Sequence, residues 1–371
     1  MDRITVLLER ITTSWNHFFL YHKFCQDQIN FNEEVRTNYF GDILSYFTDT
    51  LTFLFNPEFE KDFNKSVFQA IGILQIIYSQ QDLIDELLYI FKLQQSTKLD
   101  KEPNRKIRNE LIGHPIRRQP RGPHELISSV FYGKEFMNGT IHYVLYSKDN
   151  KYSGEEYQFQ LIEIIDNHKI FVEKYLTKIW RKIQKILKQF QSEILKLDKL
   201  VKGGIEFENL VRLTEQRFDR IQIENYLFKP TILINCHERR DEHVRYKNVT
   251  QLFLSTLIQF LLETKDNIDS LLINKHIIEK VLESEMEISF DPIIGQEETI
   301  ILGNNLLNYQ FSKLFSKHPI YGVSYFKKKF QNDEEIMEEL NNMESNFSSE
   351  LEYYSSYEYL RILLLRRNLI T

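Results

Sequence analysis

Two residue types that many folds depend on, cysteine and alanine, are scarce in this chain of 371 residues. Cys25 and Cys236 are its only cysteines and lie far apart in sequence, which excludes a disulfide framework and a paired-cysteine metal site. Ala70 is its only alanine, so any helices must be stabilised by packing rather than by alanine propensity. We therefore expect reduced thiols and neither a metal nor another cofactor.

Long apolar segments are absent as well. No apolar run reaches the ~18 residues that a membrane-spanning helix requires, and Asp2 and Arg3 bring charge to the N-terminus too early for a signal peptide. These absences predict a cytoplasmic protein without a membrane partner. With 42% hydrophobic residues the chain can bury a sizeable core, and its length suggests two domains or one domain with a large appendage.

The formal net charge of −6 argues weakly against a nucleic-acid partner, but basic residues gather locally. Between residues 98 and 121 there are eight basic residues against three acids, and a polyanion would be attracted to this stretch. On charge alone, a solvated loop is an equally good interpretation. A second basic stretch covers residues 169–202. Such a stretch is usually a solvated helix face, and a face that contacts RNA is the alternative.

Apolar periodicity predicts a mainly α fold with a small β-hairpin insertion and a helical C-terminal extension. The expected elements are helices over residues 3–29, 33–55, 63–93, 105–113 and 155–202, and hairpin strands over residues 126–132 and 140–147. Gly203-Gly204 should end the last of these helices. We therefore predict a helical domain over residues 1–204, with the hairpin near 126–147, and a helical domain of unknown role over residues 205–371.

The chemically distinctive segment is Arg108-Asn109-Glu110-Leu111-Ile112-Gly113-His114. Arginine supplies a permanent planar cation suited to a phosphodiester, and histidine can take and give a proton near neutral pH. RNA brings its own nucleophile, the 2′-hydroxyl group. A site that positions the backbone, moves one proton and stabilises a charged phosphorane needs no metal.

Helix geometry limits this interpretation. Arg108 and His114 are six residues apart, so on an ideal α-helix they lie ~120° apart in angle and ~9 Å apart along the axis. Gly113 and Pro115 bias His114 away from helical geometry, and an arginine from a second copy could reach across a two-fold interface. The alternative is a helix end stopped by Gly-His-Pro, with Arg108 in a surface ion pair.

Arg108-Asn109 followed by His114 resembles the motif of the HEPN superfamily (higher eukaryotes and prokaryotes nucleotide-binding), in which an arginine and a polar residue precede a histidine. The family's spacer of four to six residues admits the five found here. The long helices expected on either side, and the segments Gln80-Gln81-Asp82 and 112–115, also look like bacterial HEPN proteins. The resemblance covers roughly residues 60–200. It implies a helical bundle that dimerises, with both Arg/His pairs in a shared cleft, and many members are ribonucleases of antiphage, abortive-infection or toxin systems.

Carried over to this sequence, the resemblance implies that Arg108 stabilises the phosphorane, His114 acts as general acid/base and Asn109 orients substrate or histidine. We expect support from Glu110, which could hold the imidazole in one tautomer, and from Gln81 and Asp82, although Gln81 is at least as well explained as a satisfied buried amide. The predicted RNA-binding residues are Arg105, Lys106, Arg117, Arg118 and Arg121. The implied partners are RNA, a second copy and an antitoxin or defence-system protein.

Three hypotheses therefore compete. The first is a metal-independent endoribonuclease that leaves 2′,3′-cyclic phosphate and 5′-hydroxyl ends, and the second is a HEPN-like module that binds RNA or nucleotide without cutting. The third is a structural protein in which the basic helix forms an assembly seam. A metal site near Cys236 is disfavoured, because His237 and His243 are six residues apart rather than four and two arginines lie between them.

Overall fold

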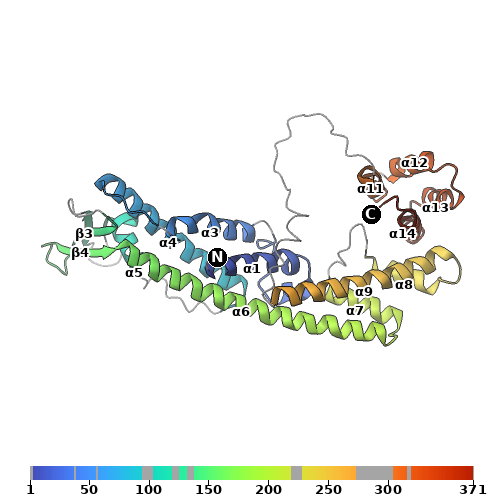
Figure 1. Cartoon of the computed structure of the whole chain (residues 1–371), viewed down its shortest axis with the longest axis horizontal. Helices are drawn as coiled ribbons and strands as arrows, with labels where there is room; N and C mark the ends of the chain where they lie inside the picture. The colour runs from blue at the N-terminus through green and yellow to red at the C-terminus, as the bar shows by residue number, and fades with distance from the viewer. Residues whose placement is uncertain are drawn as a thin grey trace. The chain divides into compact units, whose positions relative to one another are not determined.

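The computed structural model describes residues 3–36, 39–55, 57–93, 103–118, 125–131, 138–218, 228–272, 304–315 and 319–370 (Figure 1). Its fold is mainly α-helical with one small antiparallel sheet, which confirms the predicted fold class. None of the described helices combines the length and apolarity that crossing a bilayer requires. The chain forms two compact units, unit 1 (Met1–Leu20 and Phe24–Leu187) and unit 2 (Tyr21–Lys23 and Lys188–Thr371).

The described residues of unit 1 form five helices ahead of the sheet, two π-helical turns, four strands and the first part of the long helix α6. The elements are α1 (Arg3–Ser14), η1 (Trp15–Phe19), α2 (Lys23–Asp27), α3 (Tyr39–Phe55), α4 (Phe63–Ile90), α5 (Pro103–Arg108), η3 (Asn109–Gly113), β1 (Ile116–Arg118), β2 (Leu126–Phe131), β3 (Thr140–Tyr146), β4 (Glu155–Gln160) and α6 (Leu161–Lys202). α4 begins where the side chain of Asp62 accepts a hydrogen bond from the Lys65 amide at 3.1 Å, as an N-cap residue does.

The first predicted helix is interrupted in the structure. α1 ends at Ser14, a π-helical turn follows, and α2 is a separate short helix, so the prediction of one helix over residues 3–29 was wrong. The wider turn lets the indole of Trp15 stack on the ring of Phe40 with centroids 3.7 Å apart. The second helix starts at Tyr39 rather than at residue 33.

The sheet has the order β1-β2-β3-β4, with every neighbouring pair antiparallel. The predicted hairpin is confirmed as β2 and β3, in which Val130 pairs with Val144. β4 was missed, because residues 155–160 had been assigned to the long helix. Tyr157 and Phe159 alternate along β4 and their rings stack on Tyr143 of β3 at 5.3 and 6.2 Å, which favours a strand.

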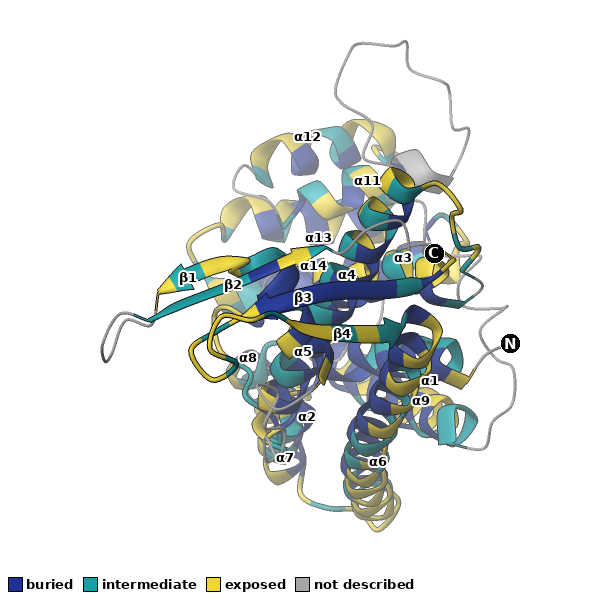
Figure 2. Cartoon of the chain, turned by 90° about the vertical axis from the view of Figure 1, so that its left-hand side faces the viewer, coloured by how far each residue is buried: buried dark blue, intermediate teal, exposed yellow. Residues whose placement is uncertain are grey.

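β3 is the central buried strand of the sheet and joins it to the helices (Figure 2). Ile141, Tyr143 and Leu145 project from it into a core shared with α4, α5, η3 and the start of α6. From the helices, Ile77 and Ile107 enter the same core and are 0% and 2% exposed. The short motif helix therefore lies between a long helix and a sheet, both of which limit its movement.

Unit 2 is helical throughout its described residues, as predicted. Besides the end of α6 it contains α7 (Phe207–Arg217), α8 (Pro230–Glu238), α9 (Val244–Leu272), α11 (Asn304–Lys313), α12 (Pro319–Lys329), α13 (Glu334–Ser345) and α14 (Glu350–Arg366). α6 ends before Gly203-Gly204, as predicted. The division between the units falls within α6, at residues 187 and 188, whereas the domain boundary placed from sequence lies at the end of that helix.

Candidate functional site

The Arg108–His114 segment is not a regular α-helix. α5 ends at Arg108 and continues as the π-helical turn η3, closed by a 2.8 Å hydrogen bond from the His114 amide to the Asn109 carbonyl. A π-turn pairs residues five apart, which places Arg108 close to Gly113. A methyl group added at Gly113 would lie 2.7 Å from Nη1 of Arg108. The guanidinium is therefore held beside the residue that precedes His114.

Neutral groups hold the side chain of Arg108. Its Nε and Nη2 donate to Oε1 of Gln75 at 3.2 and 3.0 Å, and its Nη1 donates to Oδ1 of Asn109 at 3.1 Å. The Cζ atom of Arg108 lies 4.3 Å from the centroid of the Tyr78 ring. These partners fix the orientation of the guanidinium but do not neutralise its charge.

His114 combines an exposed side chain with a fixed backbone. Its own amide closes the π-turn, and the carbonyl of the next residue, Pro115, accepts a 2.7 Å hydrogen bond from the Ser129 amide of β2. β1 begins at Ile116. The imidazole is thus presented to solvent from a position that is anchored on the helical side and on the sheet side.

Arg105 is placed differently from Arg108. Its guanidinium is buried, forms an ion pair with Asp82 and donates from Nε to Oε1 of Gln81 at 2.9 Å. Gln81 also exchanges two hydrogen bonds with the amide of Asn104, at 3.1 and 3.2 Å. Gln81 is thus a satisfied buried amide, and with Asp82 it fixes α5 against α4 rather than contacting Arg108 or His114. We leave Arg105 out of the proposed RNA-binding set.

Glu110 connects the motif to the sheet. Its buried carboxylate accepts a 2.6 Å hydrogen bond from the hydroxyl of Tyr143 and lies 3.9 Å from Nζ of Lys106. Burial, reinforced by this hydrogen bond, raises the pKa of Tyr143. Within the part of the chain that the structure describes, Glu110 makes no contact with the His114 ring, and its observed role is to anchor η3 to β3.

The other predicted RNA-binding residues lie near the motif. Lys106 is exposed on α5, with Nζ 5.4 Å from the Tyr157 ring centroid. Arg117 is half-buried and Arg118 exposed on β1, an edge strand of the sheet. Arg121 lies outside the described residues.

Comparisons with family models, with curated proteins and with solved structures found no match to this chain. Its function therefore has to be argued from the geometry of its own residues.

Sequence reasoning missed three residues of the site, Gln75, Tyr78 and Tyr143. Gln75, Tyr78 and Gln81 are spaced by three along α4, so they repeat on one face of that helix. This polar stripe beside an apolar one was visible in the sequence. Tyr143 carried no comparable indication, because aromatic residues are common in buried strands.

A second cluster of ionisable groups lies in unit 2. His243, Glu338 and Glu339 present ligand-type atoms within 4.8 Å of one another. However, Nδ1 of His243 accepts hydrogen bonds from the backbone N and the Nε of Arg245, whose guanidinium also lies 3.5 Å from Glu339. Arg245 already supplies the positive charge that a metal ion would bring, so this cluster is a poor metal site.

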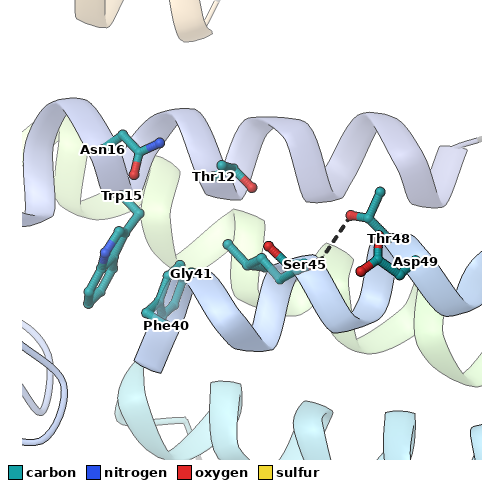
Figure 3. A pocket seen from close by; sticks show the side chains of 9 residues that line it. Thr12, Trp15, Asn16, Phe40, Gly41, Ser45, Thr48 and Asp49 are labelled. Atoms are coloured by element: carbon teal, nitrogen blue, oxygen red, sulfur yellow. Dashed lines mark hydrogen bonds between the residues drawn. The ribbon is translucent and has the colours of Figure 1, made fainter. Parts of the chain in front are cut away.

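A shallow pocket of about 360 Å³ opens between α1, η1 and α3 (Figure 3). Trp15 and Phe40 form its apolar part, and hydroxyl, amide and carboxylate groups, among them Asn16, Ser45 and Asp49, line the rest. None of its lining residues is basic and none was predicted from sequence. The pocket therefore offers nothing that would attract a phosphate.

Proposed function

We propose that this protein is a HEPN-like, metal-independent endoribonuclease with Arg108 and His114 as its catalytic pair. The observation that supports this most directly is the contrast in pairing between two arginines of α5. Arg105 is neutralised by the carboxylate of Asp82, whereas among the described residues the side-chain hydrogen bonds of Arg108 all go to amide oxygens. Its charge stays available next to Gly113, the residue that precedes the exposed His114. Two of the ~five N–H groups of the guanidinium remain to bind phosphate oxygens.

In the proposed reaction, the neutral imidazole of His114 accepts the proton of the RNA 2′-hydroxyl as that oxygen attacks the adjacent phosphorus. Arg108 stabilises the negative charge that grows on the phosphorane oxygens. The bond to the 5′-oxygen then breaks, and this oxygen takes a proton from a protonated imidazole. His114 of a second copy would supply that proton in a homodimer, and the products are a 2′,3′-cyclic phosphate and a 5′-hydroxyl end.

The biological setting rests on the HEPN resemblance. A bacterial antiphage or toxin system would require the activity to be restrained until needed, by an antitoxin or another defence protein. The proposed partners are therefore RNA, a second copy and such a regulator.

The test is cleavage of single-stranded RNA in the presence of EDTA. We expect wild-type protein to cleave, and His114→Ala and Arg108→Ala each to lose about 10²-fold or more, the usual contribution of a general acid–base group. Arg212→Ala is the matched control, because Arg212 is an exposed arginine paired with Glu208 on α7. Equal cleavage by all four proteins would exclude Arg108 and His114 as the catalytic pair.

The second candidate function is RNA binding without cleavage. It is favoured by the three hydrogen bonds that Arg108 makes inside the protein, which suit a structural arginine as well. It predicts salt-sensitive RNA affinity that does not depend on His114, and no turnover.

A further inference from the structure

The middle of α6 carries a run of positive charge without a single acid. Residues 174–187 contain five basic residues and no aspartate or glutamate. Four of them, Lys174, Lys178, Arg181 and Lys185, are spaced by four, three and four residues and form what we call the basic stripe. On an α-helix this spacing keeps them within an arc of about 60°. The opposite face of α6 is fully buried, as Ile179 and Ile183 show.

The electrostatics of a neighbouring lysine support the view that charge accumulates here. The pKa of Lys182 is lowered, first by burial and then by the positive charges of Lys185 and of Lys92, which lies two residues beyond the end of α4. Elsewhere on α6 three lysines have acidic partners, in the pairs Lys169–Asp166, Lys196–Glu193 and Lys202–Asp198. Among the described residues, Lys174, Arg181 and Lys185 have no such ion pair.

We infer that the basic stripe binds the phosphate backbone of RNA. That the bound polyanion is RNA rests on the proposed function; that the stripe binds a polyanion rests on its charge. The stripe extends for about 16 Å along α6, enough to meet several consecutive phosphates. Lys174 lies about 20 Å along the helix from Leu161, which shares the core with Ile107 of α5. The stripe would therefore contact nucleotides away from the cleaved bond and would bind without taking part in the chemistry.

Two other partners fit the stripe less well. Protein interfaces generally have an apolar or aromatic centre, but between residues 171 and 194 of α6 no large hydrophobic side chain is among the exposed ones. A membrane-surface helix needs an apolar face to insert, and the apolar face of α6 is buried in the protein. Ile170, one turn before Lys174, is 67% exposed, but a single apolar side chain at one end of the stripe is not an interface centre. The stripe itself presents positive charge, which suits a nucleic-acid backbone.

The experiment is the salt dependence of binding to a long fluorescent single-stranded RNA, measured by anisotropy. The stripe variant is Lys174→Gln, Arg181→Gln and Lys185→Gln together, and the matched control is Lys196→Gln, Lys199→Gln and Lys202→Gln, with the same change of charge on the same helix. Each lost phosphate contact should lower the slope of log K against log salt by about 0.7. When salt is raised from ~50 to ~200 mM, the stripe variant should lose about 18-fold less affinity than wild type loses, and the control should match wild type.

Three results would overturn the inference: a stripe variant with the wild-type slope, an equal reduction in the control, or binding of wild type to anionic lipid vesicles but not to RNA. Cleavage measured in parallel separates this inference from the proposed function. The stripe variant should cleave saturating RNA at the wild-type rate, whereas His114→Ala should bind with the wild-type slope and not cleave. A wild type that binds RNA through the stripe but never cleaves would refute the nuclease proposal alone.

Discussion

Arg105 and Arg108 lie one turn apart on the same short helix, and each guanidinium lies 4.3 Å from the same Tyr78 ring. Their difference comes from α4, which offers a carboxylate to the first and an amide to the second. From the sequence, Arg108 was predicted to be catalytic because of its spacing from His114, and Arg105 was predicted to bind RNA. The partner of a side chain depends on a neighbouring helix, so spacing within one segment could not predict it.

Gly113 tests the placement of Arg108 most directly. In Gly113→Ala the new methyl group would overlap Nη1 of Arg108, at 2.7 Å, so the end of this flexible side chain must move. We expect RNA cleavage to fall about tenfold or more, since a small misplacement of a catalytic group is costly. The free energy of unfolding should change little. Cleavage rates and urea unfolding of the same preparation would check both expectations.

Gly72→Ala is the control for this substitution. Gly72 lies in α4, and a methyl group there would meet nothing within 4 Å. Alanine is favoured over glycine by about 1 kcal/mol inside a helix, so this variant should be more stable and equally active. If Gly113→Ala cleaved RNA as well as Gly72→Ala does, the observed position of the Arg108 guanidinium would not matter for activity.

Helices and strands were predicted well where one hydrophobic pattern runs over the whole element. They were predicted poorly where the sequence does not mark a boundary or where contacts distant in sequence decide the conformation. The helix over residues 63–93 and the hairpin were recognised because each follows a single pattern over its length. Residues 155–160 were assigned to α6, since no glycine or proline separates β4 from it. The widening of the motif helix into a π-turn also escaped prediction, because contacts with α4 and β2 stabilise it and these are distant in sequence.

Gly139 links two elements, and its substitution should weaken the sheet. Its φ is +78°, its carbonyl accepts a 2.7 Å hydrogen bond from the Leu161 amide at the start of α6, and an added methyl group would lie 2.8 Å from the Phe59 ring. Gly139→Ala should therefore lose more than the ~1–2 kcal/mol that a left-handed backbone costs a non-glycine residue.

The matched comparison is Gly204→Ala, where φ is +75° but no atom lies within 4 Å of the added group. This variant should lose only the backbone cost, about 1–2 kcal/mol. Urea unfolding followed by circular dichroism measures both. A loss at Gly139 no larger than the loss at Gly204 would show that the close approach of Phe59 does not constrain the chain.

At the scale of the whole molecule, the chain divides into two compact units whose unfolding can be followed separately. Unit 1 holds the candidate catalytic pair and the basic stripe, and unit 2 has its own core around α14. The sequence predicted that the C-terminal half is helical but carried no indication of its role. Trp15 and Trp180, the only tryptophans, both belong to unit 1, so tryptophan fluorescence reports the unfolding of that unit.

Acid should destabilise unit 1 through His168. This buried histidine accepts or donates one 2.8 Å hydrogen bond with Gln80, and burial lowers its pKa from 6.5 to about 3. Between these values the unfolded chain binds a proton that the folded unit does not, so stability is complete above pH 6.5 and falls as the pH decreases. The expected loss is about 1.4 kcal/mol per pH unit. Urea unfolding followed by tryptophan fluorescence at several pH values would measure it.

His168→Gln removes this titration while keeping a group that can bond to Gln80. The variant is expected to be less stable than wild type at neutral pH, because the buried site is shaped for an imidazole, but its unfolding free energy should depend less steeply on pH between 6.5 and 3. His22 is the control, because burial also lowers its pKa to about 3 but it belongs to unit 2. If the two units unfold independently, His22→Gln should leave the tryptophan fluorescence transition of unit 1 unchanged. An unaltered pH slope in His168→Gln would mean that acid acts on unit 1 through other groups, since the substituted side chain cannot be protonated in this range.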